Sequence, residues 1–360
     1  MSALIAALGM FVVAAVLFDA FETVILPRRV SRRFRLTSHY YRSTWAAWAG
    51  IGDRIPKHRR ESILGFYGPA SLIVLFALWA ALLILGFALM YRGIGLVPSG
   101  SPQAAGFGTD LYYSGTTFFT LGLGDISTTR SLGRGLTVIE TGTGLGFLAL
   151  VIGYLPVLYQ AFSRREVHIS MLDARAGSPP TAVSLLQRLP HAEHPEVLDD
   201  LLRTWELWAA ELLESHLSFP LLAYFRSQHD HQSWIAALTA ILDLGAVLLA
   251  IEPERPRPQA RLTFAMARHC AVDLAQIFGR DEQTPAPDRL SPAESERLPL
   301  LLGAWPSGAE SAAALRRFHE LRRTYEPLAA SIASYFRMEL PPWIPTPGAI
   351  DDWQTAVTVD

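Results

Sequence analysis

Apolar residues along this chain are concentrated in three long segments that carry almost no charge, and polar residues lie between and after them. Residues 62–91 form a run of thirty without a charged side chain, and residues 141–163 form a second run of twenty-three. A third apolar run, residues 3–18, continues past Asp19 and Glu22. Because about 20 apolar residues cross the hydrocarbon core of a bilayer as a helix, the pattern predicts three transmembrane helices.

The N-terminal run has two other interpretations, a secretory signal peptide and a helix lying in the membrane interface. No basic residues precede its apolar part, no small-x-small cleavage site follows it, and its continuation is acidic, which argues against a signal peptide. A spanning helix over residues 1–26 is therefore predicted, with the interfacial helix as the alternative. Asp19 and Glu22 then lie near its inner end, where Arg28 and Arg29 can neutralise them.

Basic residues predict the orientation of these helices. Residues 27–62 contain ten Lys or Arg and two acids, whereas residues 93–109 contain no charge. Since basic loops stay on the cytoplasmic side, we expect a cytoplasmic 27–62 loop and C-terminal region, and an N-terminus outside. This describes a multi-pass protein of the plasma membrane, here the inner membrane of a bacterium. Within the loop, three aromatic residues at helical spacing predict an interfacial helix rather than a solvated loop: Tyr41, Trp45 and Trp48.

The composition agrees with a membrane protein and excludes several functional classes. Charged residues make up 18 % of the chain, below the roughly 25 % of an average soluble protein. The net charge of −2 argues against a protein that binds nucleic acid through a basic surface. Cys270 is the single cysteine, which excludes an intrachain disulfide and a cysteine zinc cluster. No residues with catalytic spacing are found, so neither an enzyme, a cofactor nor a resident metal is predicted.

The loop between the second and third apolar runs contains a glycine pattern that a regular helix cannot accommodate. Residues 110–119 are predicted to form a short helix, and an alternating T-L-G-L-G-D segment follows it. Alternating glycines allow successive residues to adopt backbone conformations of opposite hand, which can point consecutive carbonyl groups to one side. A row of carbonyls repeated by symmetry can replace the water shell of a cation. The residues of this segment are Thr120, Leu121, Gly122, Leu123, Gly124 and Asp125.

With these residues, the chain resembles the pore domain of potassium channels, whose selectivity filter reads T-V-G-Y-G-D. Tyr112 and Tyr113 match the aromatic pair that opens the pore helix, L-G-R at 132–134 matches the start of the inner helix in bacterial channels, and Gly144 lies at the glycine hinge. The resemblance implies an all-α pore domain over residues 63–163, in a homotetramer that surrounds permeant potassium ions. Its expected parts are an outer helix at 63–91, a pore helix at 110–119, a filter at 120–125 and an inner helix at 134–162.

Three positions depart from the pattern of the family. Leu123 and Leu121 replace the filter tyrosine and valine, and Thr116 occupies a position where some relatives carry a glutamate that pairs with the filter aspartate. The carbonyl row survives these changes because it is made by the backbone. A non-selective cation channel is therefore one alternative. A receptor or scaffold with a vestigial pore, in which this loop is only a glycine-rich turn, is another.

The inner helix carries the residues expected to gate the pore. Beyond Gly144, the resemblance implies that an apolar ring faces the pore and can close it by dewetting, unless these residues face lipid or other helices. They are Leu145, Leu148, Ile152 and Pro156. Pro156 is also expected to bend the helix near its inner end. Glu140 lies about one turn before Gly144, and we expect it behind the filter, accepting hydrogen bonds from Thr116 or Thr117.

The C-terminal region reads as a linker at 164–180, an α-helical cytoplasmic domain at 181–340 and a Pro-rich tail at 341–360. No glycine-rich nucleotide-binding motif follows a predicted strand, and the sequence identifies neither a ligand nor a partner. Four clustered histidines are interpreted as solvated rather than as metal ligands: His191, His194, His229 and His231. Periodicity predicts helices at 181–188, 195–216, 219–227, 232–251, 258–278 and 309–337.

Overall fold

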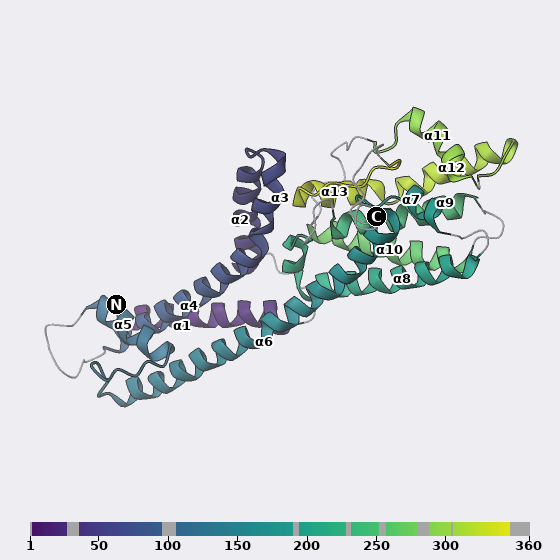
Figure 1. Cartoon of the computed structure of the whole chain (residues 1–360). Coiled ribbons are helices and arrows are strands. Elements are labelled where there is room, and N and C mark those ends of the chain that lie inside the picture. Colours follow the sequence, from purple (N-terminus) through teal and green to yellow (C-terminus); the bar gives the residue numbers. More distant parts are fainter. Residues whose placement is uncertain are drawn as a thin grey trace, which may run out of the picture. The chain divides into compact units, whose positions relative to one another are not determined.

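The computed structural model describes residues 2–26, 36–95, 106–189, 194–227, 232–251, 257–278, 288–303 and 305–345. Every regular element in these ranges is a helix (Figure 1), which confirms the predicted all-α membrane fold. The chain divides into two compact units. The first unit is formed by Met1–Ile55 and Phe66–Gln160, and the second by Pro56–Gly65 and Ala161–Asp360.

Two apolar helices of the first unit pack against each other in antiparallel directions. They are α1 (Ser2–Ala20), extended by the π-helical turn η1 (Phe21–Ile25), and α4 (Tyr67–Ile94). A Cβ on Gly9 would lie 2.4 Å from the Gly86 carbonyl oxygen, and one on Gly93 would lie 2.5 Å from the Ala6 Cβ. Small residues allow such close approach in membranes. Because α1 pairs with α4 along its length, the contact favours a spanning helix over an interfacial one.

Asp19 lies in the last turn of α1, where this helix packs against the first half of α4. Its side chain is buried and accepts hydrogen bonds from the Thr37 amide at 3.2 Å, the Thr37 hydroxyl at 2.5 Å and the Trp79 indole at 3.1 Å. A carboxylate at the beginning of α2 (Leu36–Gly52) also complements the helix dipole. Arg28 and Arg29, the partners proposed from the sequence, lie outside the described residues. Within the described residues, Asp19 accepts from neutral groups of α2 and α4.

The aromatic stripe of α2 packs against α4. The ring of Tyr67 lies 4.9 Å from that of Trp45 and 6.2 Å from that of Trp48. The Tyr67 hydroxyl also donates to the Tyr41 carbonyl at 3.2 Å, and Trp45 is buried. These contacts account for the spacing that predicted a helix at the headgroup level. The stripe therefore packs on the start of α4, with Trp45 buried and Tyr41 and Trp48 partly exposed.

The helix α6 (Ser131–Ala176) corrects the predicted boundaries of the inner helix and of the linker. It is one continuous helix of 46 residues, roughly 69 Å long at 1.5 Å per residue. The inner helix does not end at residue 162, and most of the predicted linker at 164–180 is helical. Four residues at helical spacing are buried in the second unit and keep the chain helical beyond the charged Arg164. They are Arg165, Ile169, Leu172 and Ala176.

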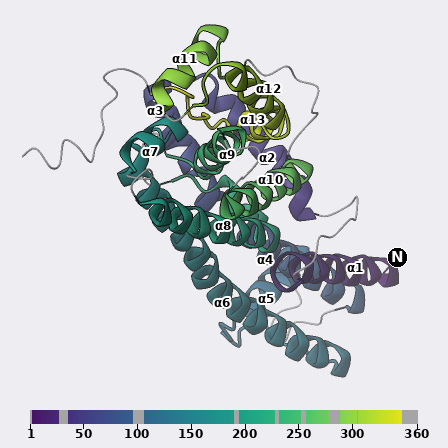
Figure 2. The same ribbon diagram turned by 90° about the vertical axis from the view of Figure 1, so that its right-hand side faces the viewer.

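The second unit is a bundle of helices around α9 (Figure 2). Its helix α9 is long and apolar enough to cross a membrane, but 89 % of its apolar window is buried inside the protein. The corresponding values are 28, 44 and 17 % for the helices that contain α1, α4 and α6. We therefore interpret α9 as the core of the bundle and the other three as the spans. The elements of the bundle are α7 (Ala182–Arg188), α8 (Pro195–Ser218), η3 (Pro220–Tyr224), α9 (Trp234–Ile251), α10 (Pro258–Phe278), α11 (Pro292–Leu302), α12 (Ala309–Arg323) and α13 (Glu326–Phe336).

Three features of this bundle differ from the helices predicted by periodicity. The helix predicted at 219–227 is only the short 3-10 helix η3. The helix α11 was not predicted, although Ser291 and Glu294 form the capping box that begins it, a signal present in the sequence as S-x-x-E. The single helix predicted at 309–337 is divided, because α13 begins anew at Glu326 with a proline in its first turn. The predicted C-terminal tail lies outside the described residues from 346 onward.

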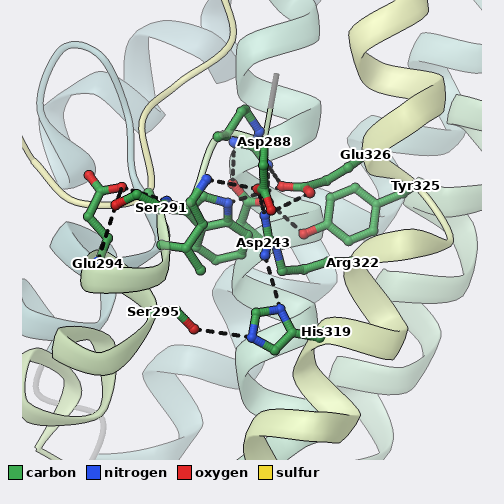
Figure 3. Close-up of polar contacts among 12 residues, drawn as sticks. Asp243, Asp288, Ser291, Glu294, Ser295, His319, Arg322, Tyr325 and Glu326 are labelled. Atoms are coloured by element: carbon green, nitrogen blue, oxygen red, sulfur yellow. Dashed lines mark hydrogen bonds and ion pairs between the residues drawn. The ribbon is translucent and has the colours of Figure 1, made fainter. Parts of the chain in front are cut away.

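A network of buried charges holds α9 to α13 (Figure 3). Arg289 donates to both carboxylate oxygens of Asp243, at 2.7 and 3.0 Å, and to Glu326 at 2.8 Å. Arg322 donates to the other oxygen of Glu326 at 2.8 Å, and Tyr325 donates to Asp243 at 2.6 Å. Asp243 is 1 % exposed. Its charge is therefore balanced by Arg289 rather than by water.

We expect Arg289→Met to destabilise the second unit strongly. The substitution leaves the Asp243 carboxylate buried without a cation, and removal of one partner of a buried pair costs about 3–5 kcal/mol. Thermal unfolding of the full-length protein in detergent measures this effect. Arg203→Met is the matched control, since Arg203 and Asp200 are 69 and 75 % exposed and such pairs contribute about 0–1 kcal/mol. Equal midpoints for the two variants would contradict the interpretation.

Candidate functional site

The pore-helix region of the first unit is formed by α5 (Phe107–Phe118), which begins three residues earlier than predicted. Its C-terminus is closed by two backbone hydrogen bonds, from the Leu121 amide to the Thr116 carbonyl at 2.8 Å and from the Thr120 amide to the Thr117 carbonyl at 3.0 Å. This is the Schellman pattern, which requires a left-handed residue just after the helix. Thr120 is that residue, with φ of 56°.

Residues 120–125 continue from this turn with alternating backbone hand. Gly122 has φ of 58° and Gly124 has φ of 75°, so left-handed residues recur at every second position from Thr120. This alternation is the conformation that a row of carbonyls directed to one side requires. The sequence predicted it at the two glycines but not at Thr120. The side chains of Leu121 and Leu123 are 60 and 63 % exposed, so the pattern is made by the backbone alone.

Asp125 is held by Tyr112, which lies in the middle of α5. The Tyr112 hydroxyl donates to an Asp125 carboxylate oxygen at 2.9 Å. Thr116, at the position where some relatives have a glutamate, donates instead to the Tyr113 carbonyl at 3.0 Å. Tyr112 therefore ties the last residue of the predicted filter to α5. Sequence reasoning identified Tyr112 as part of the motif but did not assign it this contact.

Behind α5, Glu140 connects three helices. Its side chain is fully buried. One carboxyl oxygen contacts the Ser114 hydroxyl of α5, and the other accepts from the Tyr91 hydroxyl of α4 at 2.8 Å. The sequence predicted a position behind the filter with hydroxyl partners but named Thr116 or Thr117. The observed partners are Ser114 and Tyr91, while Thr116 donates to the Tyr113 carbonyl.

Gly144 lies where α6 crosses the end of the pore helix. A Cβ at this position would lie 2.0 Å from the Phe118 carbonyl oxygen, so the backbones of the two helices are in direct contact. The helix α6 is continuous through this point. The structure thus gives Gly144 a packing role, whereas the resemblance implied a hinge.

The four residues expected to line the pore fall on one exposed face of α6. Their spacing of three, four and four residues keeps them on one side of a helix. Leu145, Leu148 and Ile152 are 53, 55 and 63 % exposed, and Pro156 is also exposed. Pro156 does not interrupt the helix. The face is free to contact other subunits, a pore or lipid.

The C-terminal part of α6 is anchored in the second unit by Arg165. Its guanidinium donates to the Leu222 carbonyl at 2.9 Å and to the Phe225 carbonyl at 2.7 Å, and it pairs with Glu166 at 2.9 Å. Burial, together with the neighbouring Arg165, lowers the pKa of His216 to about 3. The imidazole is therefore neutral at physiological pH beside the cation.

No group of three or more His, Cys, Asp or Glu side chains that could hold a metal ion occurs among the residues that the structure describes. His194 is described, and its ring lies 3.1 Å from a Glu196 carboxylate oxygen. The other three clustered histidines, His191, His229 and His231, lie outside the described ranges.

Comparison with known proteins supports the same region. Residues 72–160 match the model of a family described as "Ion channel", which confirms the resemblance to the potassium-channel-like pore family over α4, α5 and the first part of α6. The chain is also 25 % identical over 265 residues to the uncharacterized membrane protein YdjJ of Bacillus subtilis (strain 168). That alignment covers 71 % of this chain and 76 % of the relative, so the similarity extends beyond the pore segment. No solved structure matches.

Proposed function

We propose that this chain is the subunit of a homotetrameric transmembrane channel that conducts potassium ions passively and selectively. The observation that carries the proposal is the alternating backbone hand at Thr120, Gly122 and Gly124, directly after α5 and between two membrane-length helices. The row of carbonyls from one chain cannot surround an ion. Four copies around an axis supply complete rings that replace the hydration shell of the ion.

The electrostatics of α5 suit a cation. Its C-terminus points into the turn at Thr120, and a helix C-terminus carries a partial negative charge of about half a unit. Four such termini stabilise a cation near the inner end of the filter. The Asp125 carboxylates, held by Tyr112, attract cations to the outer end.

A non-selective cation channel is the second candidate, and Leu123 is the observation that favours it. The tyrosine of the family can hydrogen-bond behind the filter, whereas leucine cannot. Here the filter is supported instead by the Tyr112–Asp125 contact at its outer end and by the Schellman turn at its inner end. We propose that these two supports keep the carbonyl rings at the size that suits potassium.

We further propose a plasma-membrane location, in the inner membrane of a bacterium, with the N-terminus outside and the second unit in the cytoplasm. The support is the ten-to-two excess of basic over acidic residues at 27–62, together with the antiparallel packing of α1 on α4. In this orientation the exposed face of α6 with Leu148 and Ile152 forms the inner part of the pore. We propose that the second unit acts on the pore through α6, the helix whose C-terminal part belongs to that unit.

Measurement of the reversal potential in mixed potassium and sodium tests the proposal. Purified protein reconstituted in planar bilayers is expected to give currents that reverse near the potassium equilibrium potential. Reversal midway between the potassium and sodium potentials would identify a non-selective channel. Flux no greater than that of protein-free bilayers would identify a scaffold with a vestigial pore.

A further inference from the structure

Glu140 belongs to a cluster of oxygen atoms behind the filter in which every close contact requires a hydrogen. Ser114 Oγ lies 2.8 Å from the Ile84 carbonyl oxygen and also contacts Glu140. Tyr91 Oη lies 2.8 Å from Glu140. Three further pairs involve Thr137 Oγ1, which lies 2.8 Å from Tyr113 Oη, 2.9 Å from the Gly133 carbonyl oxygen and 3.3 Å from Tyr91 Oη.

Counting hydrogens shows that the hydroxyl groups alone cannot satisfy this cluster. Six oxygen pairs are in contact, whereas the Ser, Thr and two Tyr hydroxyls supply only four hydrogens. A carbonyl oxygen can only accept, so Thr137 must donate to Gly133, and Ser114 must donate to Ile84. Tyr113 then donates to Thr137, and Tyr91 donates to its nearer acceptor, Glu140 at 2.8 Å, rather than to Thr137 at 3.3 Å. The contact between Ser114 and Glu140 still lacks a hydrogen.

The surroundings of Glu140 also disfavour a charged carboxylate. The side chain is fully buried, and no cationic group contacts it in the part of the chain that the structure describes. The titratable groups that face it are the phenol of Tyr91 on α4 and, one contact further, that of Tyr113 on α5. A buried carboxylate without a cation or a full set of donors is strongly disfavoured in low dielectric.

We infer that Glu140 carries its proton in the native protein and donates it as a hydrogen bond to Ser114, which makes it a positioning residue for the pore helix. The effect of Glu140 on conduction rests on the proposed channel function, whereas its protonation does not. As an acid, Glu140 donates to α5 and accepts from α4, while Ser114 remains bonded to the Ile84 carbonyl. All three helices are joined through one neutral group.

The Glu140–Ser114 contact lies one helical turn before a second contact between α5 and α6. Ser114 precedes Phe118 by four residues, and Glu140 precedes Gly144 by four, so the Glu140–Ser114 bond and the Gly144–Phe118 contact follow one register. Phe118 leads directly into the turn at Thr120. The protonated Glu140 therefore fixes the axial position of α5 and, through α5, the start of the filter. An ionised Glu140 would draw the hydrogen of Ser114 away from α4.

Infrared spectroscopy of the full-length protein in lipid tests the protonation directly. We expect the C=O stretching band of a protonated carboxylic acid at neutral pH, lost in Glu140→Gln and kept in the control Glu166→Gln. Glu166 lies on the same helix but pairs with Arg165, so it contributes only carboxylate bands. If the Glu140→Gln protein fails to fold, Ser114→Ala provides the second variant. Because it removes the acceptor of the Glu140 proton, it should shift the C=O band to the frequency of a carboxylic acid that donates no hydrogen bond. Absence of an acid band assignable to Glu140 would overturn the inference.

Flux measurements test the positioning role. Glutamine presents an amide N–H to Ser114 and an oxygen to Tyr91, so Glu140→Gln is expected to keep potassium flux within about twofold of wild type, whereas Glu140→Leu should lower it roughly tenfold. Equal flux from both variants would overturn the positioning role. If wild type itself conducts nothing, the proposed function fails, and the infrared band still decides whether Glu140 is protonated.

Discussion

Replacement of Gly122 or Gly124 by alanine is expected to abolish potassium flux while leaving the rest of the fold intact. Both glycines adopt positive φ, 58° and 75°, where a Cβ crowds the neighbouring carbonyl oxygen and costs about 1–2 kcal/mol per residue. Four copies in one filter multiply this to roughly 4–8 kcal/mol. A Cβ at either site would meet no other atom of its own chain within 4 Å. The effect is therefore one of backbone conformation rather than of steric overlap.

Gly115→Ala is the matched control for this experiment. Gly115 lies in α5, its φ is not in the left-handed region, and a Cβ there also meets nothing within 4 Å. Because alanine is favoured over glycine in a helix by about 1 kcal/mol, this variant should fold and conduct at least as well as wild type. Potassium uptake into liposomes measures all three variants. Equal uptake by Gly124→Ala and Gly115→Ala would contradict the proposed role of the alternating backbone.

The conformation of the filter could be predicted from the sequence because glycine is the residue that adopts left-handed conformations without strain. The alternation of Gly122 and Gly124 carries that information locally. Thr120 carries no such signal, since a threonine is ordinarily right-handed or extended. Its positive φ follows from the hydrogen bonds that close α5, and these depend on where the helix ends. That end was predicted at residue 119 and lies at Phe118.

For Glu140, the sequence could predict burial but not the hydrogen-bond partners. Its burial behind the pore helix follows from the cost of a carboxyl group within an apolar span. The choice between Ser114 and Thr116 depends on the rotation of α5 about its own axis, since two residues differ by about 200° on a helix. That rotation is set by contacts far apart in sequence, such as Ser114 with the Ile84 carbonyl at 2.8 Å.

The start of the predicted linker at 164–180 is wrong. Its first residues, Arg164 and Arg165, belong to the continuous helix α6. Arg165 is 3 % exposed, and its donors are satisfied by the Leu222 and Phe225 carbonyls, nearly 60 residues further along the chain. An arginine can be buried where carbonyl groups surround its planar fork. No local sequence pattern predicts such a site, because the acceptors are backbone carbonyls whose positions depend on the tertiary fold.

Gly144→Ala is expected to lower both the thermal stability of the protein and potassium flux. A new Cβ would lie 2.0 Å from the carbonyl oxygen, 2.9 Å from the carbonyl carbon and 3.2 Å from the Cα of Phe118. All three are backbone atoms, so the overlap cannot be relieved by a side-chain rotation. Forcing extra atoms into a packed contact costs typically about 1–3 kcal/mol, and α5 must move away from α6. The turn at Thr120 moves with α5, which is why conduction should fall together with stability.

Gly142→Ala and Gly146→Ala separate this packing role from a hinge. Both glycines lie in the same helix within two residues of Gly144, and a Cβ at either one meets nothing within 4 Å. Each should raise stability slightly, because alanine favours the helix by about 1 kcal/mol. If Gly144 were only a hinge, its replacement would likewise leave the unfolding temperature unchanged or raised, and only the open probability would change. The unfolding midpoints of the three variants in detergent therefore discriminate between the roles: a drop confined to Gly144→Ala identifies the contact with Phe118, since a hinge makes no demand on the space beside it.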